Sequence, residues 1–281
     1  MAITLSSVDA AARRIRHSRD VDFGAYVLRP GAVERALVAA ARAGARVHVT
    51  LQRDPYRGGP GERHANRDAA RVLRAAGARV TLLDRDRVPF HLKAAVCDGT
   101  AFLDDRNWSG DAKELVIADD RPGDVAAVRR ALRGTGSRSD ALATRKDAAL
   151  RLEARLIERA RDAPVVVETE SFGAGEISAA LRRHALRGAP TELIVAAREA
   201  SHNPRERALL ASLRRDGVVV RKTSVDEKVV LAGDAAWVGS ANATYAGGGA
   251  GAQIDWGLVT RRPEVVAAVR RALQRDSLAA G

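Results

Sequence analysis

The sequence predicts an α/β protein built from two similar halves. Strand-like apolar segments alternate with segments of helical periodicity along the whole chain of 281 residues. His91 to Asn107 can be laid on Asp226 to Asn242 without a gap, and Lys93 then falls on Lys228. The octet VAAVRRAL also occurs in each half, at 125–132 and at 266–273. A single repeat of about half the chain indicates a pseudo-twofold protein rather than a solenoid.

The elements of the first half follow from periodicity and from the residues that end each segment. Gly44 and Gly77 are typical of helix C-termini, and short β-branched apolar runs are typical of strands covered on both faces. A polar loop at 52–63 follows a predicted strand, a position that often carries binding groups. The predicted helices are 7–18, 31–45, 66–76 and 124–133. The predicted strands are 21–28, 47–51, 79–83, 101–103 and 114–118.

The same order recurs in the second half, after a linker predicted at 134–140 (GTGSRSD). The two predicted domains are therefore 1–135 and 141–281. The helices of the second half are expected to end near Arg161, Leu186, Arg215 and Arg275. Its strands are expected at 165–168, 193–197, 218–221 and 254–260.

Charge and composition suggest the partners. The formal net charge is +12, and 42 of the 47 basic residues are arginines. Such a chain attracts the phosphates of nucleic acid or of anionic lipid headgroups, so peripheral contact with an anionic membrane is one expectation. No signal peptide and no apolar run near the ~20 residues of a transmembrane helix is visible. The lone Cys97 excludes an internal disulfide, and the expected location is the cytoplasm, or outside the cell where a signal peptide has been removed.

One short segment carries the chemistry. His91 and Lys93 lie two residues apart on an extended stretch, and side chains at this spacing project from the same face of a strand. An imidazole and an ammonium group can then converge on one anionic group. The structural interpretation is preferred for the remaining histidines: His17, His48, His64, His184 and His202. His64 and His202 fall in predicted loops after strands, and they stay candidates for contact with substrate.

The segment His91-x-Lys93-x4-Asp98 resembles the HxKxxxxD signature of the phospholipase D superfamily, and residues 239–242 (GSAN) resemble its GSxN continuation. The resemblance implies two phospholipase D-like lobes, each a mixed sheet flanked by helices, with the site at the lobe interface. It also implies hydrolysis or transfer of a phosphodiester through a phosphohistidine on His91, without a metal or another cofactor. Because the duplicated halves supply both sides of such a site, we expect a monomer.

The resemblance assigns roles to further residues. Lys93 and Lys228 would neutralise the non-bridging oxygens of the transition state. Neutral donors to the same oxygens would be Asn107, Asn242 and Ser240. The resemblance gives Asp98 a largely structural part among the motif residues. By position, Asp255 would orient His91, since a carboxylate on one imidazole nitrogen fixes the tautomer, and Glu114 would be its counterpart in the first half.

The chain departs from this pattern at two places. In the second half the histidine position holds Asp226 and the motif's aspartate position holds Gly233, so we hypothesise that Asp226 protonates the leaving group. In the first half Asp104 and Asp105 replace the expected Gly-Ser. Either Asp105 points away from the phosphate or the phosphate subsite is shifted.

Three functions remain open at this point. A nuclease and a phospholipase or phosphatidyltransferase are close rivals. Strong basicity and 4% aromatic residues favour nucleic acid, because interfacial enzymes usually expose apolar and aromatic anchors. The third is a pseudoenzyme that binds phosphodiesters without turnover, since only one of the two motifs is intact.

Overall fold

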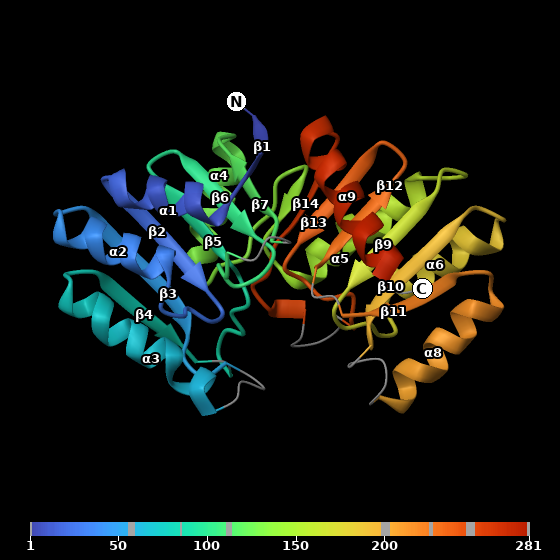
Figure 1. Cartoon of the computed structure of the whole chain (residues 1–281), viewed down its shortest axis with the longest axis horizontal. Coiled ribbons are helices and arrows are strands. Elements are labelled where there is room, and N and C mark those ends of the chain that lie inside the picture. The colour runs from blue at the N-terminus through green and yellow to red at the C-terminus, as the bar shows by residue number, and fades with distance from the viewer. Residues whose placement is uncertain are drawn as a thin grey trace. The chain divides into compact units, whose positions relative to one another are not determined.

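The computed structural model describes residues 2–55, 60–84, 86–110, 114–197, 203–224, 227–245 and 251–279 (Figure 1). It consists of two compact units, Met1–Arg145 with Ala252–Trp256, and Lys146–Gly251 with Gly257–Gly281. The division therefore falls after Arg145, beyond the predicted linker at 134–140, and a short segment near the C-terminus joins the first unit. Each unit contains a mixed sheet with helices beside it, so the predicted fold class is confirmed.

The first unit is built on a seven-stranded sheet with the order β1-β7-β6-β5-β2-β3-β4. Parallel pairs join β2, β3 and β4, and antiparallel pairs join the other neighbours. The bounds are β1 (Ile3–Ser6), β2 (Asp20–Ala25), β3 (Arg46–Gln52), β4 (Arg79–Leu83), β5 (Ala94–Cys97), β6 (Thr100–Asp104) and β7 (Val116–Asp119). The central strand β5 is buried along its whole length, as expected for a strand covered on both faces.

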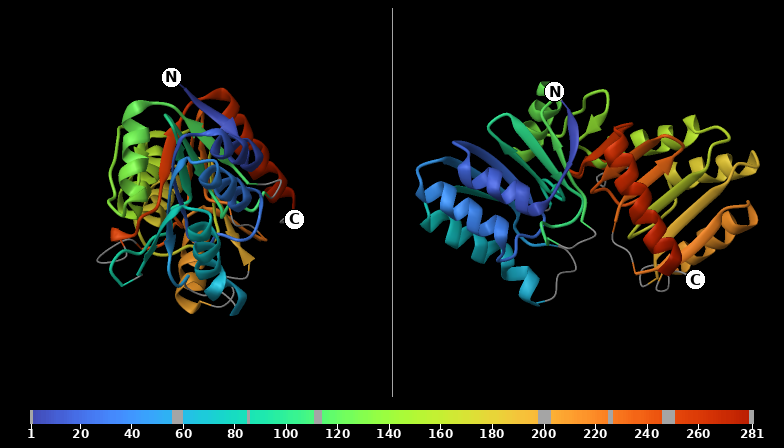
Figure 2. Two further views of the ribbon diagram at one scale, coloured as in Figure 1. Left: turned by 90° about the vertical axis from the view of Figure 1, so that its left-hand side faces the viewer. Right: turned by 45° about the horizontal axis from the view of Figure 1, so that its top comes forward.

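Three helices cover one face of this sheet and one helix covers part of the other (Figure 2). The first three are α1 (Val8–His17), α2 (Ala32–Arg42) and α3 (Pro60–Ala75), and the fourth is α4 (Pro122–Leu132). The main core lies under α1 and α2, where Ile15, Phe23 and Leu37 are fully buried. On the other face α4 approaches closely, because a Cβ at Gly24 would lie 2.6 Å from a methyl group of Leu132.

The second unit repeats this plan. Its sheet has the order β11-β10-β9-β12-β13-β14-β8, again with parallel and antiparallel pairs. The strands are β8 (Leu142–Ala143), β9 (Val165–Thr169), β10 (Thr191–Ala196), β11 (Val219–Thr223), β12 (Val229–Ala232), β13 (Ala235–Gly239) and β14 (Gly257–Thr260). The helices are α5 (Lys146–Arg159), α6 (Glu176–Leu186), α8 (Pro204–Arg215) and α9 (Pro263–Ala279).

The sequence-based boundaries differ from the structure at a few points. β1 was not predicted, and α3 begins at Pro60, inside the predicted loop 52–63. The prediction of one continuous strand over 254–260 is wrong. Ile254 forms an isolated parallel bridge to Phe90, and β14 begins only at Gly257. The apolar run is split because its first part pairs with a segment of the first unit. Among the described residues, no helix is long and apolar enough to cross a membrane.

Candidate active site

Hydrogen bonds from two sides hold the backbone just before β5. The side chain of Gln52, at the end of β3, accepts a hydrogen bond from the Phe90 amide at 2.8 Å and donates one to the Leu83 carbonyl at 2.8 Å. The His91 amide donates to the Ile254 carbonyl at 2.8 Å, and the Ile254 amide donates to the Pro89 carbonyl at 2.8 Å. His91 is thereby presented from a backbone that is fixed on both edges.

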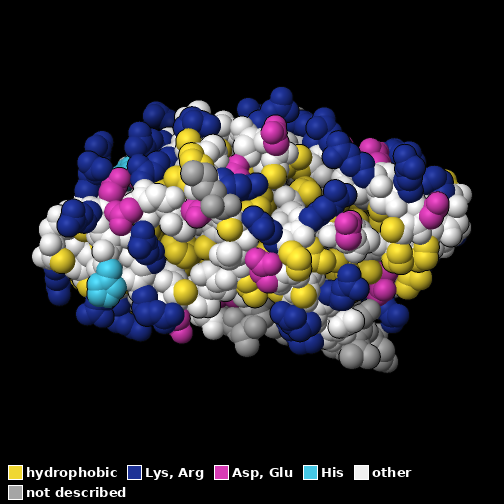
Figure 3. Space-filling view, turned by 90° about the horizontal axis from the view of Figure 1, so that it is seen from above, with side chains coloured by type: hydrophobic (Ala, Val, Ile, Leu, Met, Phe, Trp, Pro, Cys, Tyr) yellow, Lys and Arg dark blue, Asp and Glu magenta, His cyan; other side chains and the backbone are white. Residues whose placement is uncertain are grey.

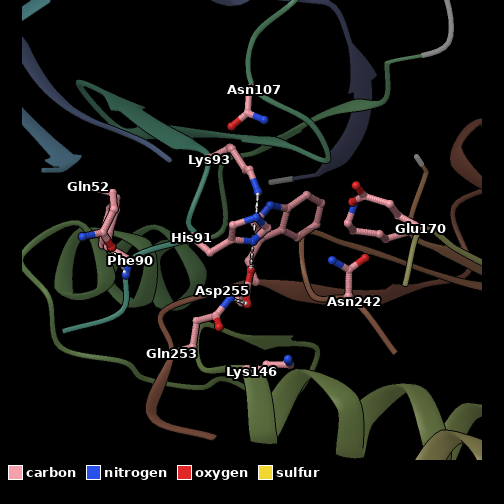
Figure 4. A network of polar contacts seen from close by, with 12 residues as sticks. Gln52, Phe90, His91, Lys93, Asn107, Lys146, Glu170, Asn242, Gln253 and Asp255 are labelled. Atoms are coloured by element: carbon pink, nitrogen blue, oxygen red, sulfur yellow. Dashed lines mark hydrogen bonds and ion pairs between the residues drawn. The ribbon is translucent and has the colours of Figure 1, made fainter. Parts of the chain in front are cut away.

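The Nδ1 of His91 lies 2.8 Å from Oδ1 of Asp255, within the first unit (Figure 4). The Asp255 side chain is fully buried, whereas 20% of the His91 side chain is exposed. Gln253 donates from Nε2 to the other carboxylate oxygen of Asp255 at 2.7 Å. Because an ionised carboxylate only accepts, Nδ1 carries the proton and Nε2 keeps its lone pair. An imidazole in this tautomer, partly exposed as His91 is, can act as a base or as a nucleophile through Nε2.

Lys93 places a cation beside the His91 ring. Its Nζ is 2.9 Å from Nε2 and 3.0 Å from Nδ1 of His91, and 5.7 Å from the ring centroid of Tyr26. The Tyr26 ring in turn meets the His91 ring edge-on, with centroids 4.7 Å apart. Lys93 is only 1% exposed, and a buried ammonium group strongly favours an anion that arrives next to it. A buried cation and a partly exposed imidazole are therefore combined at one point.

The two motif asparagines make the same contact in the two units. Oδ1 of Asn107 accepts a hydrogen bond from the Val27 amide at 3.3 Å, just after β2. Oδ1 of Asn242 accepts one from the Ser171 amide at 3.4 Å, just after β9. With the oxygen used by the backbone, the amide NH₂ of each residue is the group available as a donor.

The second unit differs at the position of its motif. Lys228 is 4% exposed, and its Nζ lies 3.2 Å from a carboxylate oxygen of Glu170. Ser240, the residue that follows β13, is fully buried. Asp226, the candidate second proton donor, lies outside the described residues. The lysine of this unit therefore already has a carboxylate partner.

Asp98 lies at the opposite end of β5 from His91. It has a positive φ of 55°, and its Oδ1 accepts hydrogen bonds from the amides of Arg19 and Asp20, each at 3.1 Å. This places the motif aspartate where it holds the start of β2, a structural position. Glu114 accepts from the amide of Ser109 at 2.8 Å and from its hydroxyl at 3.0 Å, so it supports the loop after Trp108.

The two aspartates that replace Gly-Ser are fully buried and hold the same loop. Oδ2 of Asp104 accepts from the Trp108 amide at 2.8 Å, and Oδ1 of Asp105 accepts from the Leu115 amide at 2.9 Å. Burial, with the charges of Glu114 and Asp105, raises the pKa of Asp104 well above its ordinary value. One oxygen of Asp105 is thus turned to the backbone of the loop rather than used as a replacement for a phosphate donor.

A group of carboxylates in the second unit was not predicted. Glu168, Glu227 and Asp276 are buried, and one oxygen of each lies within 4.8 Å of the others. By strand register Glu168 corresponds to Gly24, since each pairs with the residue that follows the motif lysine. Three carboxylate oxygens at this spacing could hold a cation. The only sequence signal was a glutamate directly after the apolar run of β9.

Comparison with known proteins shows an extensive structural similarity to a solved structure. No family model and no curated protein matches the sequence. The polyphosphate kinase from Porphyromonas gingivalis has a similar structure, with a TM-score of 0.68 and 16% identity over 97% of this chain. This chain has the phospholipase D fold.

The phospholipase D-like chain spans 46% of the length of that polyphosphate kinase. Two smaller structures resemble about half of it. Nuc from Salmonella typhimurium, a phospholipase D family member, has a TM-score of 0.42 at 19% identity, over 47% of this chain and 89% of that one. NucT from Helicobacter pylori has a TM-score of 0.40 at 19% identity, over 48% of this chain and 90% of that one.

Proposed function

We propose that this protein is a phospholipase D-like enzyme that cleaves or transfers phosphodiesters through a phosphohistidine on His91. The observation that supports it most directly is the contact between Asp255 and His91, which leaves Nε2 as the nucleophilic nitrogen. The cation of Lys93 at 2.9 Å from that nitrogen supports an anionic, phosphate-bearing substrate.

The proposed reaction has two displacement steps. Nε2 of His91 attacks phosphorus, and the bond from phosphorus to the leaving oxygen breaks as that oxygen takes a proton. Asp255 stabilises the imidazolium that forms, and Lys93 neutralises the charge on the non-bridging oxygens. Water, or an acceptor alcohol, then attacks phosphorus and releases His91. We assign the proton for the leaving group to Asp226.

Nucleic acid is the substrate class that we favour over phospholipid. Lys and Arg side chains are spread widely over the face seen in Figure 3, and Asp and Glu are fewer. Such a surface suits an extended polyanion, and binding of this kind weakens steeply with salt. Release of headgroup from phospholipid vesicles, with DNA and RNA left intact, would contradict this choice. Polyphosphate belongs in the same panel because of the structural similarity to a polyphosphate kinase.

A second candidate function is phosphodiester binding without turnover. The ion pair of Lys228 with Glu170 favours it, because a carboxylate already neutralises the lysine that the second motif would contribute. Glu170→Gln distinguishes the two functions. If Lys228 is needed for turnover, this variant should show activity at least equal to that of the unaltered protein.

The decisive experiment is turnover of an aryl phosphodiester in the presence of EDTA, with His91→Asn as the matched control. We expect activity that EDTA does not remove and that His91→Asn abolishes. A denaturing quench at alkaline pH during turnover should trap a phosphoenzyme on the unaltered protein only, and later treatment with acid should release its phosphate. No His91-dependent turnover of this probe, DNA, RNA, phospholipid or polyphosphate would leave the binding function as the better account.

A further inference from the structure

Within the described residues, no helix covers part of one sheet face in the first unit. α1, α2 and α3 pack on the opposite face, while α4 packs mainly on β2, β5 and β6. Between α4 and the uncovered strands β3 and β4 lies a cavity of about 630 Å³. Its volume is typical of a small-molecule site. The residues that line it do not include His91, Lys93 or Asp255; of the residues described for the His91 site only Asp20 and Leu83 recur, and those took part through their backbone groups.

The floor of the cavity is polar and crosses three strands. His48 on β3 lies between Asp22 on β2 and Thr81 on β4. Its Nδ1 is 3.5 Å from Oδ1 of Asp22, and its Nε2 is 3.2 Å from Oγ1 of Thr81. The Asp22 side chain is 8% exposed and that of His48 is 23% exposed. The floor therefore presents an imidazole whose orientation is held from both sides.

Four arginines also line the cavity: Arg46, Arg79, Arg129 and Arg133. Asp20 holds two of them, with its carboxylate oxygens 2.9 Å from Nε of Arg46 and 3.3 Å from Nη1 of Arg129. The hydrogen bond to Arg46 is the main cause of a lowered pKa of Asp20, and the contact with Arg129 adds to it. The carboxylate of Asp20 therefore stays charged into the acid range. Among the described residues, the guanidinium groups of Arg79 and Arg133 have no ion pair or hydrogen bond. Four arginines against two aspartates leave a surplus of positive charge in the cavity.

The second unit shows that the fold does not require this arrangement. The cross-strand row Asp22, His48 and Arg79 corresponds by register to Val166, Glu192 and Val219. In that unit Glu192 forms an ion pair with Arg221, at 2.6 Å. The position of His48 is thus occupied by Glu192, a residue in an ion pair, and the position of Arg79 is occupied by Val219. Among the described residues, the second unit therefore does not repeat the histidine and the arginine of this row.

We propose that this cavity binds a small phosphate compound, either a phosphate monoester or pyrophosphate, at a site separate from His91. The guanidinium fork matches two phosphate oxygens at once, and two such forks are available in Arg79 and Arg133. His48 and Thr81 provide hydrogen-bonding groups at the floor. The site does not depend on the proposed chemistry of His91.

Calorimetric titration of the full chain with inorganic pyrophosphate, at fixed ionic strength, tests the proposal. The titration is made in the His91→Asn protein, so that turnover does not interfere. The double variant Arg79→Gln/Arg133→Gln should bind about tenfold more weakly or worse. The matched control is Arg155→Gln/Arg159→Gln on α5, which removes the same charge from exposed positions and should bind as before. Because Arg79 and Arg133 make no ion pair within the described chain, their replacement should leave the unfolding temperature unchanged.

Three results would overturn the proposal. The first is unchanged pyrophosphate binding in the Arg79/Arg133 variant. The second is an equal loss in the Arg155/Arg159 variant, which would indicate attraction by net charge alone. The third is binding of a single-stranded oligonucleotide, but not of pyrophosphate, that depends on Arg79 and Arg133, since the occupant would then be a nucleic acid strand. If the unaltered protein shows no His91-dependent turnover but pyrophosphate still binds, the result counts against the proposed function and not against this site.

Discussion

Asp255 and His91 lie 164 residues apart in the chain, and yet Oδ1 of one is 2.8 Å from Nδ1 of the other. The contact depends on the short parallel bridge between Ile254 and Phe90, which brings the residues that follow each of them side by side. Gln253 then holds the second oxygen of the carboxylate at 2.7 Å. The imidazole is therefore oriented by a segment that joins the first unit from far along the sequence.

Asp255→Asn should lower kcat by a factor on the order of 10² to 10⁴, because an amide no longer fixes the tautomer with the proton on Nδ1. The measurement is aryl phosphodiester turnover. Asp234→Asn is the control, since Asp234 is 83% exposed and pairs only loosely with Arg261 at 3.5 Å. A kcat for Asp255→Asn within twofold of the unaltered protein would contradict the orienting role.

Asn66→Ala should destabilise the first unit by about 2–4 kcal/mol, because it leaves buried backbone groups without partners. The side chain of Asn66 is fully buried. Its amide NH₂ donates to the carbonyls of Tyr26 and Gln52 at 2.7 Å each, and its Oδ1 accepts a hydrogen bond from the Leu28 amide at 2.8 Å. Urea unfolding measures the effect. The helix N-cap Asn203 is the comparison, and its replacement by alanine should cost only about 1 kcal/mol.

Glu153→Gln should stabilise the protein at pH 8 and have little effect near pH 4. Burial raises the pKa of Glu153 well above its ordinary value of 4.5. The folded state therefore favours the protonated form of Glu153. The contribution of Glu153 to the free energy of unfolding is fully present below the pKa that this carboxyl has in the unfolded chain, and it is lost as pH rises through its pKa in the folded protein. Urea unfolding at the two pH values checks this. A gain that is equal at both pH values would argue against the titration of Glu153.

Cys97 should resist alkylation in the folded protein. Burial raises the pKa of its thiol to about 12, so almost no thiolate is present at pH 8. Mass spectrometry after treatment with iodoacetamide should show one modified thiol in urea and none in buffer. Rapid modification without denaturant would show that β5 opens far more readily than its complete burial predicts.

Much of the fold could be predicted because it depends on local pattern. The alternation of helix and strand and the spacing of His91 and Lys93 are properties of neighbouring residues, and the repeat is found when the two halves of the sequence are aligned. β1 was missed because a four-residue strand with two exposed positions carries little signal. The predicted strand 254–260 was wrong because its two ends pair with different partners, and periodicity does not reveal partners.

The sequence by itself determined the two α/β units, the motif residues and the altered second motif, since composition and spacing are sufficient for these. The position of Asp255 could be inferred only from the resemblance. Tertiary structure decided which oxygen meets which nitrogen at His91, how Asp104 and Asp105 are used, and that His48 lies on the floor of an arginine-lined cavity. These features arise where residues distant in sequence pack together, and only strand order and register bring them into contact.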